Sequence, residues 1–84
     1  MKEWNGYKPG DKVVMLIQTM GETPDGEEVV YSADTPAEIC AVRHLGPKQG
    51  WGVEVLIGEE DRTIVNVFDD ADLAREGLVW FRKA

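Results

Sequence analysis

The sequence has little cysteine, little positive charge and no long hydrophobic run, and each shortage excludes a class of protein. One cysteine among 84 residues, Cys40, excludes an intrachain disulfide and a metal site built from several cysteines. The longest apolar run, Val13–Ile17, has the length of a β-strand and is far too short to cross a membrane. We therefore expect no membrane span and no cysteine-rich metal centre.

Positive charge is scarce, because 9 Lys and Arg stand against 16 Asp and Glu, which gives a net charge of −7. Proteins bind nucleic-acid phosphates by displacing counterions with basic side chains, so this balance makes nucleic acid an unfavourable partner. A basic protein or peptide suits the charge better.

The first twenty residues lack the apolar core of a signal peptide and carry charges at Glu3 and Asp11. A lone thiol is typical of a reducing compartment. The sequence therefore predicts a cytoplasmic protein.

The chain is long enough for one domain, residues 1–84, of which 1–10 read as a polar lead-in. Hydrophobic residues make up 43% of it, too many for a disordered segment. Ordering costs roughly 1.5 kcal/mol per residue and burial returns about 25 cal/mol per Å² of apolar area, so a domain this small comes out near zero. The chain must therefore either pack unusually well or share a core with another subunit, and we expect the second, a homo-oligomer.

Short segments rich in β-branched and aromatic residues recur along the chain and predict strands. They cover residues 12–19, 29–33, 37–44, 51–57, 62–68 and 78–82, of which 29–33 is a short strand or an extended arm. Between the first two lies an acidic loop, 20–28, that holds a Pro-Asp-Gly turn signal. The segment 37–44 has helical propensity, but the preceding Pro36 and its β-favouring residues indicate a strand.

A single helical turn is predicted near residues 70–76. Asp69 or Asp70 suits its N-cap, and Gly77 can take the left-handed conformation that ends a helix. The fold class that follows is all-β, a small barrel of five or six short antiparallel strands, since closure would leave no apolar edge unpaired.

The order of these signals resembles the SH3-like barrels, including Tudor and KOW modules. The matching stretches are Pro9–Val13, Pro36–Ile39, Gly50–Val55 and Ile64–Phe68, followed by Asp72–Leu73. The resemblance implies an SH3-like fold and no particular activity.

Within that group, the pattern is similar to the type II dihydrofolate reductases, which are homotetramers around one pore. The similar stretches are Gly10–Val13, Gly50–Glu54, Val65–Phe68 and Asp72–Arg75. Asn66 stands where that family has Gln, Phe68 where it has Tyr, and an apolar run replaces its lysine pair. The resemblance implies an alternative function, an oligomer that binds NADPH or another small molecule in a shared pore.

Three aromatic residues are candidates for a binding groove or a cation–π cage: Tyr31, Trp51 and Phe68, with Trp80 beside them. The alternative is that they belong to the core or to a subunit contact. Trp4 and Tyr7 precede the first strand, and we expect them to cover a barrel end or a neighbouring subunit.

Two further groups of polar residues are candidates. Asn66 interrupts an apolar strand and is predicted on the solvent face, opposite Val65 and Val67; the alternative makes it a recognition group. Asp69 and Asp70 belong to one of two acidic patches, the other being 59–61, which serve helix capping and solubility or else bind a basic peptide. Their spacing does not match a calcium loop, so no metal is predicted.

Catalytic motifs are not found. Cys40 and His44 fall on one face of a predicted strand but about 13 Å apart, too far for a nucleophile and its base, and we expect a buried thiol and a surface imidazole. Gly50-Trp51-Gly52 lacks the third glycine of a dinucleotide fingerprint. The prediction is a non-enzymatic binding module without a cofactor, which binds a protein or basic peptide through an acidic and aromatic surface.

Overall fold

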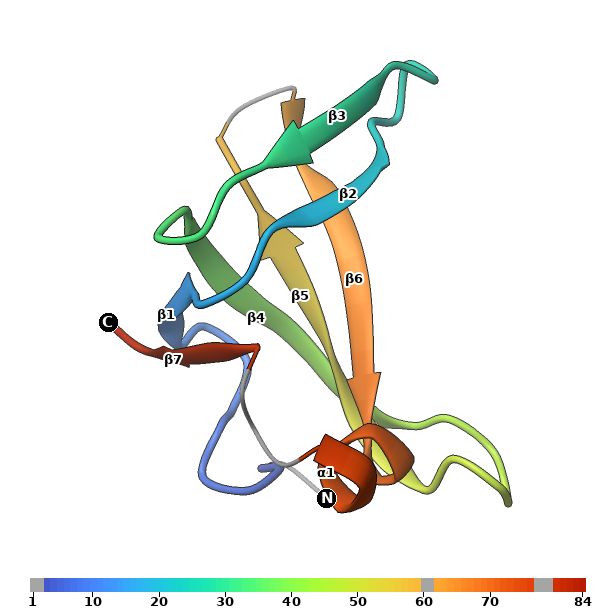
Figure 1. Ribbon diagram of the computed structural model, residues 1–84. Coiled ribbons are helices and arrows are strands. Elements are labelled where there is room, and N and C mark those ends of the chain that lie inside the picture. The colour runs from blue at the N-terminus through green and yellow to red at the C-terminus, as the bar shows by residue number, and fades with distance from the viewer. Residues whose placement is uncertain (1–2, 60–61, 77–79) are drawn as a thin grey trace.

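Seven strands and one helix are found in the computed structural model, which describes residues 3–59, 62–76 and 80–84 (Figure 1). Five strands form one antiparallel sheet in the order β6-β5-β4-β1-β7, and β2 and β3 form a separate hairpin. The elements are β1 (Lys12–Met15), β2 (Thr19–Glu22), β3 (Glu28–Tyr31), β4 (Pro36–His44), β5 (Trp51–Ile57), β6 (Ile64–Asp69), α1 (Asp70–Glu76) and β7 (Phe81–Lys83).

The predicted all-β class is confirmed, with seven strands in the described residues where five or six were expected. The ladder does not run around a closed cylinder, because β6 and β7 lie at opposite ends of the strand order. Their side chains meet instead across the interior, where the rings of Phe68 and Phe81 lie 5.2 Å apart. Across residues 3–59, 62–76 and 80–84, no helix is both long and apolar enough to span a membrane.

Strands β4 and β5 follow the sequence closely. β4 and β5 agree with the predicted strands 37–44 and 51–57, and β5 buries Val53, Val55 and Ile57 by strict alternation. The register between β4 and β5 shifts between Ile39 and Ala41, which is a β-bulge at Cys40. The bulge turns the second half of β4 relative to the first.

The strand predicted at 12–19 is two strands. β1 ends at Met15, after which Leu16 and Ile17 are exposed, and β2 begins at Thr19. The segment predicted as a loop, 20–28, forms most of the β2–β3 hairpin. The Pro-Asp-Gly sequence lies at its turn, and the residues before the turn belong to strand β2. Pairing with Glu28–Tyr31 supplies the stability that the local sequence of β2 does not indicate.

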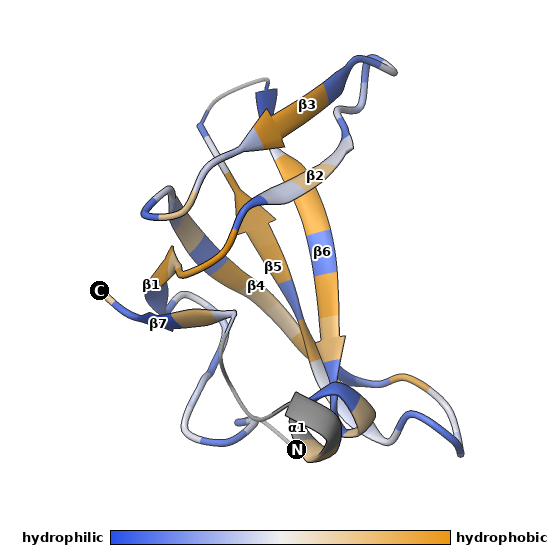
Figure 2. Cartoon of the chain, viewed as in Figure 1, coloured by the Kyte–Doolittle hydropathy of each residue, from blue (hydrophilic) through white to orange (hydrophobic). Residues whose placement is uncertain are grey.

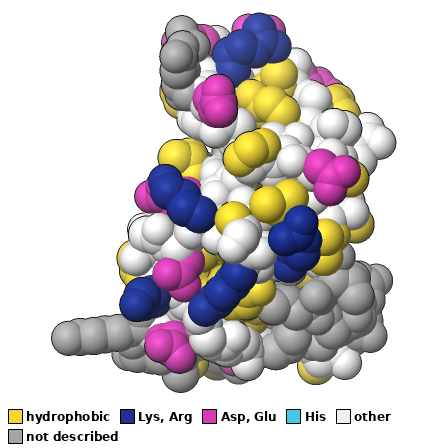
Figure 3. Space-filling view, turned by 90° about the vertical axis from the view of Figure 1, so that its left-hand side faces the viewer, with side chains coloured by type: hydrophobic (Ala, Val, Ile, Leu, Met, Phe, Trp, Pro, Cys, Tyr) yellow, Lys and Arg dark blue, Asp and Glu magenta, His cyan; other side chains and the backbone are white. Residues whose placement is uncertain are grey.

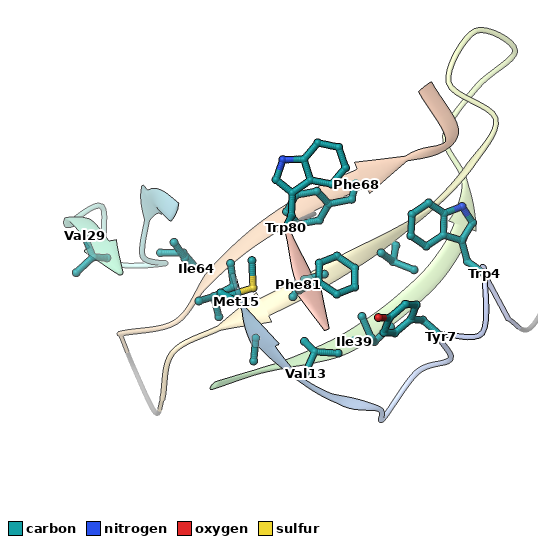
Figure 4. Packing of buried hydrophobic residues seen from close by; sticks show 14 residues of the cluster. Trp4, Tyr7, Val13, Met15, Val29, Ile39, Ile64, Phe68, Trp80 and Phe81 are labelled. Carbon is teal, nitrogen blue, oxygen red and sulfur yellow. The ribbon is translucent and has the colours of Figure 1, made fainter. Parts of the chain in front are cut away.

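The core lies between the five-stranded sheet, the hairpin and the N-terminal segment. Figure 2 shows that the hydrophobic residues are concentrated in the strands. Its aromatic part centres on Phe81, whose ring meets Tyr7 at 5.0 Å and Phe68 at 5.2 Å (Figure 4). Trp80 lies 5.4 Å from Phe68. The core residues are Trp4, Tyr7, Val13, Met15, Val29, Ala37, Ile39, Val53, Val55, Ile57, Ile64, Phe68, Trp80 and Phe81.

The helix begins where the carboxylates predict. Asp69 Oδ1 accepts the N–H of Asp72 at 2.8 Å, and Asp72 Oδ2 accepts the N–H of Asp69 at 3.1 Å, a reciprocal N-cap. The predicted end at Gly77 lies outside the described residues. So does the start of the strand predicted at 78–82, whose described part is β7.

Phe81→Ala is expected to destabilise the protein by about 3–5 kcal/mol, because it removes a ring from the centre of the aromatic cluster. Urea unfolding followed by tryptophan fluorescence measures the loss. Val30→Ala, at a half-exposed position, is the control and should shift stability by less than about 0.5 kcal/mol. Equal effects of the two substitutions would contradict this description of the core.

Candidate functional site

The residues predicted to form a site lie at two ends of the domain. Trp51, Asp69 and Asp70 gather where α1 follows β6, and Asn66 and Phe68 lead toward them along β6 (Figure 1). Tyr31 lies at the opposite end, against the turn between β5 and β6. A single groove made of all six is therefore not formed.

Asp70 connects three elements at the helix end. Its Oδ1 accepts the indole N–H of Trp4 at 2.7 Å, and its Oδ2 accepts the backbone N–H of Trp51 at 3.0 Å. Gly50 makes room for it, since a Cβ there would stand 2.6 Å from Oδ2. Together with the capping bond of Asp69, these contacts give both predicted carboxylates a structural role.

The aromatic candidates do not face one another. Phe68 is only 8% exposed and packs in the core. Trp51 is half-buried, and its ring makes a T-shaped contact with the ring of the exposed His44, with the ring centres 5.5 Å apart. Tyr31 lies over Gly58 and donates its hydroxyl to the carbonyl of Arg62 at 2.5 Å. The arrangement favours the alternative that these rings serve packing.

Trp4 and Tyr7, expected at a barrel end or subunit contact, are part of the core. Their backbones form a small bridge, with hydrogen bonds of 2.7 and 2.8 Å in the two directions. Burial raises the pKa of the Tyr7 hydroxyl, and the nearby carboxylate of Asp11 raises it further.

The predicted orientation of Asn66 is wrong. Along β6, Ile64 and Phe68 are buried while Val65 and Val67 are 51% and 44% exposed. Because side chains alternate along a strand, Asn66 lies on the interior face and is half-buried, and the two valines face outward. Burial of Ile64 and Phe68 in the core determines which face of β6 Asn66 lies on. The residues next to Asn66 in the sequence do not indicate this orientation.

Cys40 was expected to be buried, and the structure corrects this. The bulge leaves the residue exposed, with its Sγ donating to the carbonyl of Glu54 at 3.3 Å. Partial desolvation, followed by the charges of Glu54 and Glu38, raises the pKa of the thiol. His44 is exposed, as predicted. Within the described residues, no group of three or more His, Cys, Asp or Glu could hold a metal ion.

A shallow cavity of about 200 Å³ opens on the outer face of the sheet. Lys12 and Glu38, which form an ion pair with each other, line it together with Leu56 and the Gly58 turn. The lining also includes the exposed carboxylate of Glu59.

A surface that the sequence analysis missed lies on the β2–β3 hairpin. Met20 and Val30 are direct cross-strand partners and are 60% and 51% exposed. The next outward pair is Glu22 opposite Glu28, both exposed. We call these four residues the hairpin face. The sequence offers only the Pro24-Asp25-Gly26 turn as a signal here, because neither Thr19–Glu22 nor Glu28–Tyr31 alternates polar and apolar residues.

Hydrophobic side chains also reach the surface elsewhere. On the face shown in Figure 3, they lie between basic and acidic ones. Leu16 and Ile17, in the link from β1 to β2, are among the exposed apolar residues. Mixed surfaces of this kind are ordinary, so the paired arrangement on the hairpin is the more informative one.

No protein-family model, curated protein or solved structure matches the chain significantly.

Asp70→Ala is expected to lower stability by about 1–2 kcal/mol, because the Trp4 indole and the Trp51 amide both lose their acceptor. Asp70→Asn keeps a carbonyl acceptor and should lose less. Urea unfolding gives the stability, and the NMR shift of the Trp4 indole proton reports the contact directly. An unchanged indole shift in Asp70→Ala would refute the assigned role.

Cys40 should react with iodoacetamide more slowly than an unhindered thiol at mildly alkaline pH, because a raised pKa leaves less thiolate at any given pH. Glu54→Gln removes the largest charge contribution and should move the midpoint of the pH–rate profile downward and speed the reaction. Glu3→Gln is the matched control with no expected change. A midpoint unmoved by Glu54→Gln would contradict the assigned electrostatic cause.

Proposed function

We propose that this protein is a non-enzymatic binding module whose hairpin face takes a basic segment of another protein. The observation that carries the proposal is the cross-strand pair Glu22 and Glu28 beside the exposed pair Met20 and Val30.

Like charges directly opposite each other on two strands destabilise the pairing. Glu22 and Glu28 are such a pair, and Asp25 and Glu27 add further negative charge at the tip. Arg62 offsets a part of it through an ion pair with Glu27 at 3.0 Å. A Lys or Arg side chain from a partner, placed between Glu22 and Glu28, would relieve the remaining repulsion.

Met20 and Val30 supply the apolar half of the contact. Both side chains project outward beside Glu22 and Glu28. A partner strand or peptide with a basic residue next to an aliphatic one would therefore match both the charge and the apolar surface of the hairpin face. The net charge of −7 would steer such a partner from a distance.

We further propose that the domain has an SH3-like architecture and that the protein is cytoplasmic. Support for the architecture comes from a sheet of five strands with a hairpin packed against it and a helical turn before the last strand. Support for the location comes from the single, exposed thiol of Cys40.

A capped peptide that alternates lysine and leucine is expected to bind and to shift the amide resonances of Met20, Glu22, Glu28 and Val30. Binding should weaken as salt is added, since exposed charges are screened. The double variant Glu22→Gln/Glu28→Gln should lower the affinity, measured by calorimetry, about fivefold or more.

Glu3→Gln is the charge-matched control for one of these substitutions, because Glu3 is exposed beside Trp4, far from the hairpin. A peptide with glutamate in place of lysine controls for apolar binding alone. The proposal fails if both peptides bind equally, or if the shifted resonances lie away from β2 and β3.

A further inference from the structure

The two outer strands of the five-stranded sheet differ in charge. β7 carries Arg82 and Lys83, and charged side chains of this kind protect an edge from pairing with another chain. β6 has no charged residue from Ile64 to Phe68, and it is coloured as hydrophobic in Figure 2 except for a hydrophilic segment in its middle. It is an edge strand with an uncharged, partly exposed surface, the type that pairs with a further strand.

Hydrogen bonds at the end of β6 show which backbone groups face the open edge. The N–H of Asp69 donates to the side chain of Asp72, so it points away from β5. The register between β5 and β6 contains no shift, and N–H groups alternate in direction along a strand. Val65 and Val67 therefore also direct their N–H and C=O groups toward the open edge, while Asn66 pairs with β5.

We infer that β6 pairs antiparallel with β6 of a second copy of this chain, about a two-fold axis that passes Asn66. In this register Val65 of each copy lies opposite Val67 of the other, and these residues exchange reciprocal N–H···O=C bonds. The sheet would thereby continue from one copy into the next. A two-fold axis closes the assembly at a dimer.

The side chains suit that register. Val65 and Val67 would pair across the junction on the outer face, beside Leu56, which is the partner of Val65 on β5. On the interior face, the half-buried amide of Asn66 would lie opposite its own copy, where an amide can both donate and accept. The polar residue that interrupts the strand thus gains a symmetric partner.

The register also separates the charges. The strip from Ile64 to Phe68 pairs only with itself, so no carboxylate faces another within it. A register centred on Val67 would instead place Asp69 opposite Val65 of the other copy. Because each copy carries a net charge of −7, the copies repel at long range, and salt should strengthen the dimer. Binding of a basic peptide to the hairpin face has the opposite salt dependence.

The test is sedimentation equilibrium of the full chain over a range of concentrations and salt. The apparent mass is expected to rise from 9.4 kDa toward twice that value, and to do so at lower concentration when salt is added. Amide hydrogen exchange should show protection of Val65 and Val67 that grows with concentration, whereas the Asn66 amide should be protected at all concentrations.

Val67→Lys and Asn66→Asp place like charges near the axis and should weaken the dimer at least tenfold, with the fold checked by circular dichroism. Val30→Lys is the control: it is equally exposed, lies on β3 and should leave the dimer intact. A mass that stays at 9.4 kDa throughout, or exchange at Val65 and Val67 that ignores concentration, overturns the inference. Either result leaves the hairpin face proposal unaffected, since peptide binding is measured on monomer and dimer alike.

Discussion

The contact of Phe81 with Phe68 and Tyr7 is the constraint on which the rest of the structure depends. β6 and β7 are the outer strands of the sheet and share no ladder, so the interior between them is filled by these rings. Through Tyr7 the N-terminal segment packs against this cluster, and the indole N–H of Trp4 in the same segment donates to Asp70 at the start of α1. A domain this small buries too little surface to leave its terminal segments out of the core, and here both contribute.

The sequence predicted the elements whose signals are local. β4, β5 and α1 have alternation or capping carboxylates within their own residues, and these determine them. β2 was missed because its polar residues become a strand only by pairing with β3. The orientation of Asn66 and the exposure of Cys40 depend on the core positions of β6 and on a bulge, which are properties of the assembled sheet. The predicted orientations of single side chains were accordingly the less successful part.

Carboxylates serve two different purposes in this protein. Asp69 and Asp70 accept hydrogen bonds from the backbone or from Trp4, so their charge stabilises the helix end and its neighbours. Glu22 and Glu28 instead oppose each other across the hairpin. Sequence alone shows the first two in an acidic patch and the second two in an acidic loop, and only the hydrogen bonds show that their roles differ. A carboxylate with an internal donor is explained by the fold, and a pair of opposed carboxylates is not.

The same distinction applies to the exposed aliphatic residues. The core requires Ile64 and Phe68 on the interior face of β6, but it places no demand on Val65 and Val67, where threonine or a charged residue would suit a strand as well. β7 illustrates the usual solution: Lys83 approaches Asp11 at 3.8 Å and lies 5.4 Å from the centre of the Tyr7 ring, so its edge is charged and covered. The apolar side chains of Val65 and Val67 are therefore not required by the core, and they lie on an edge without charge, which is the observation from which the pairing of β6 is inferred.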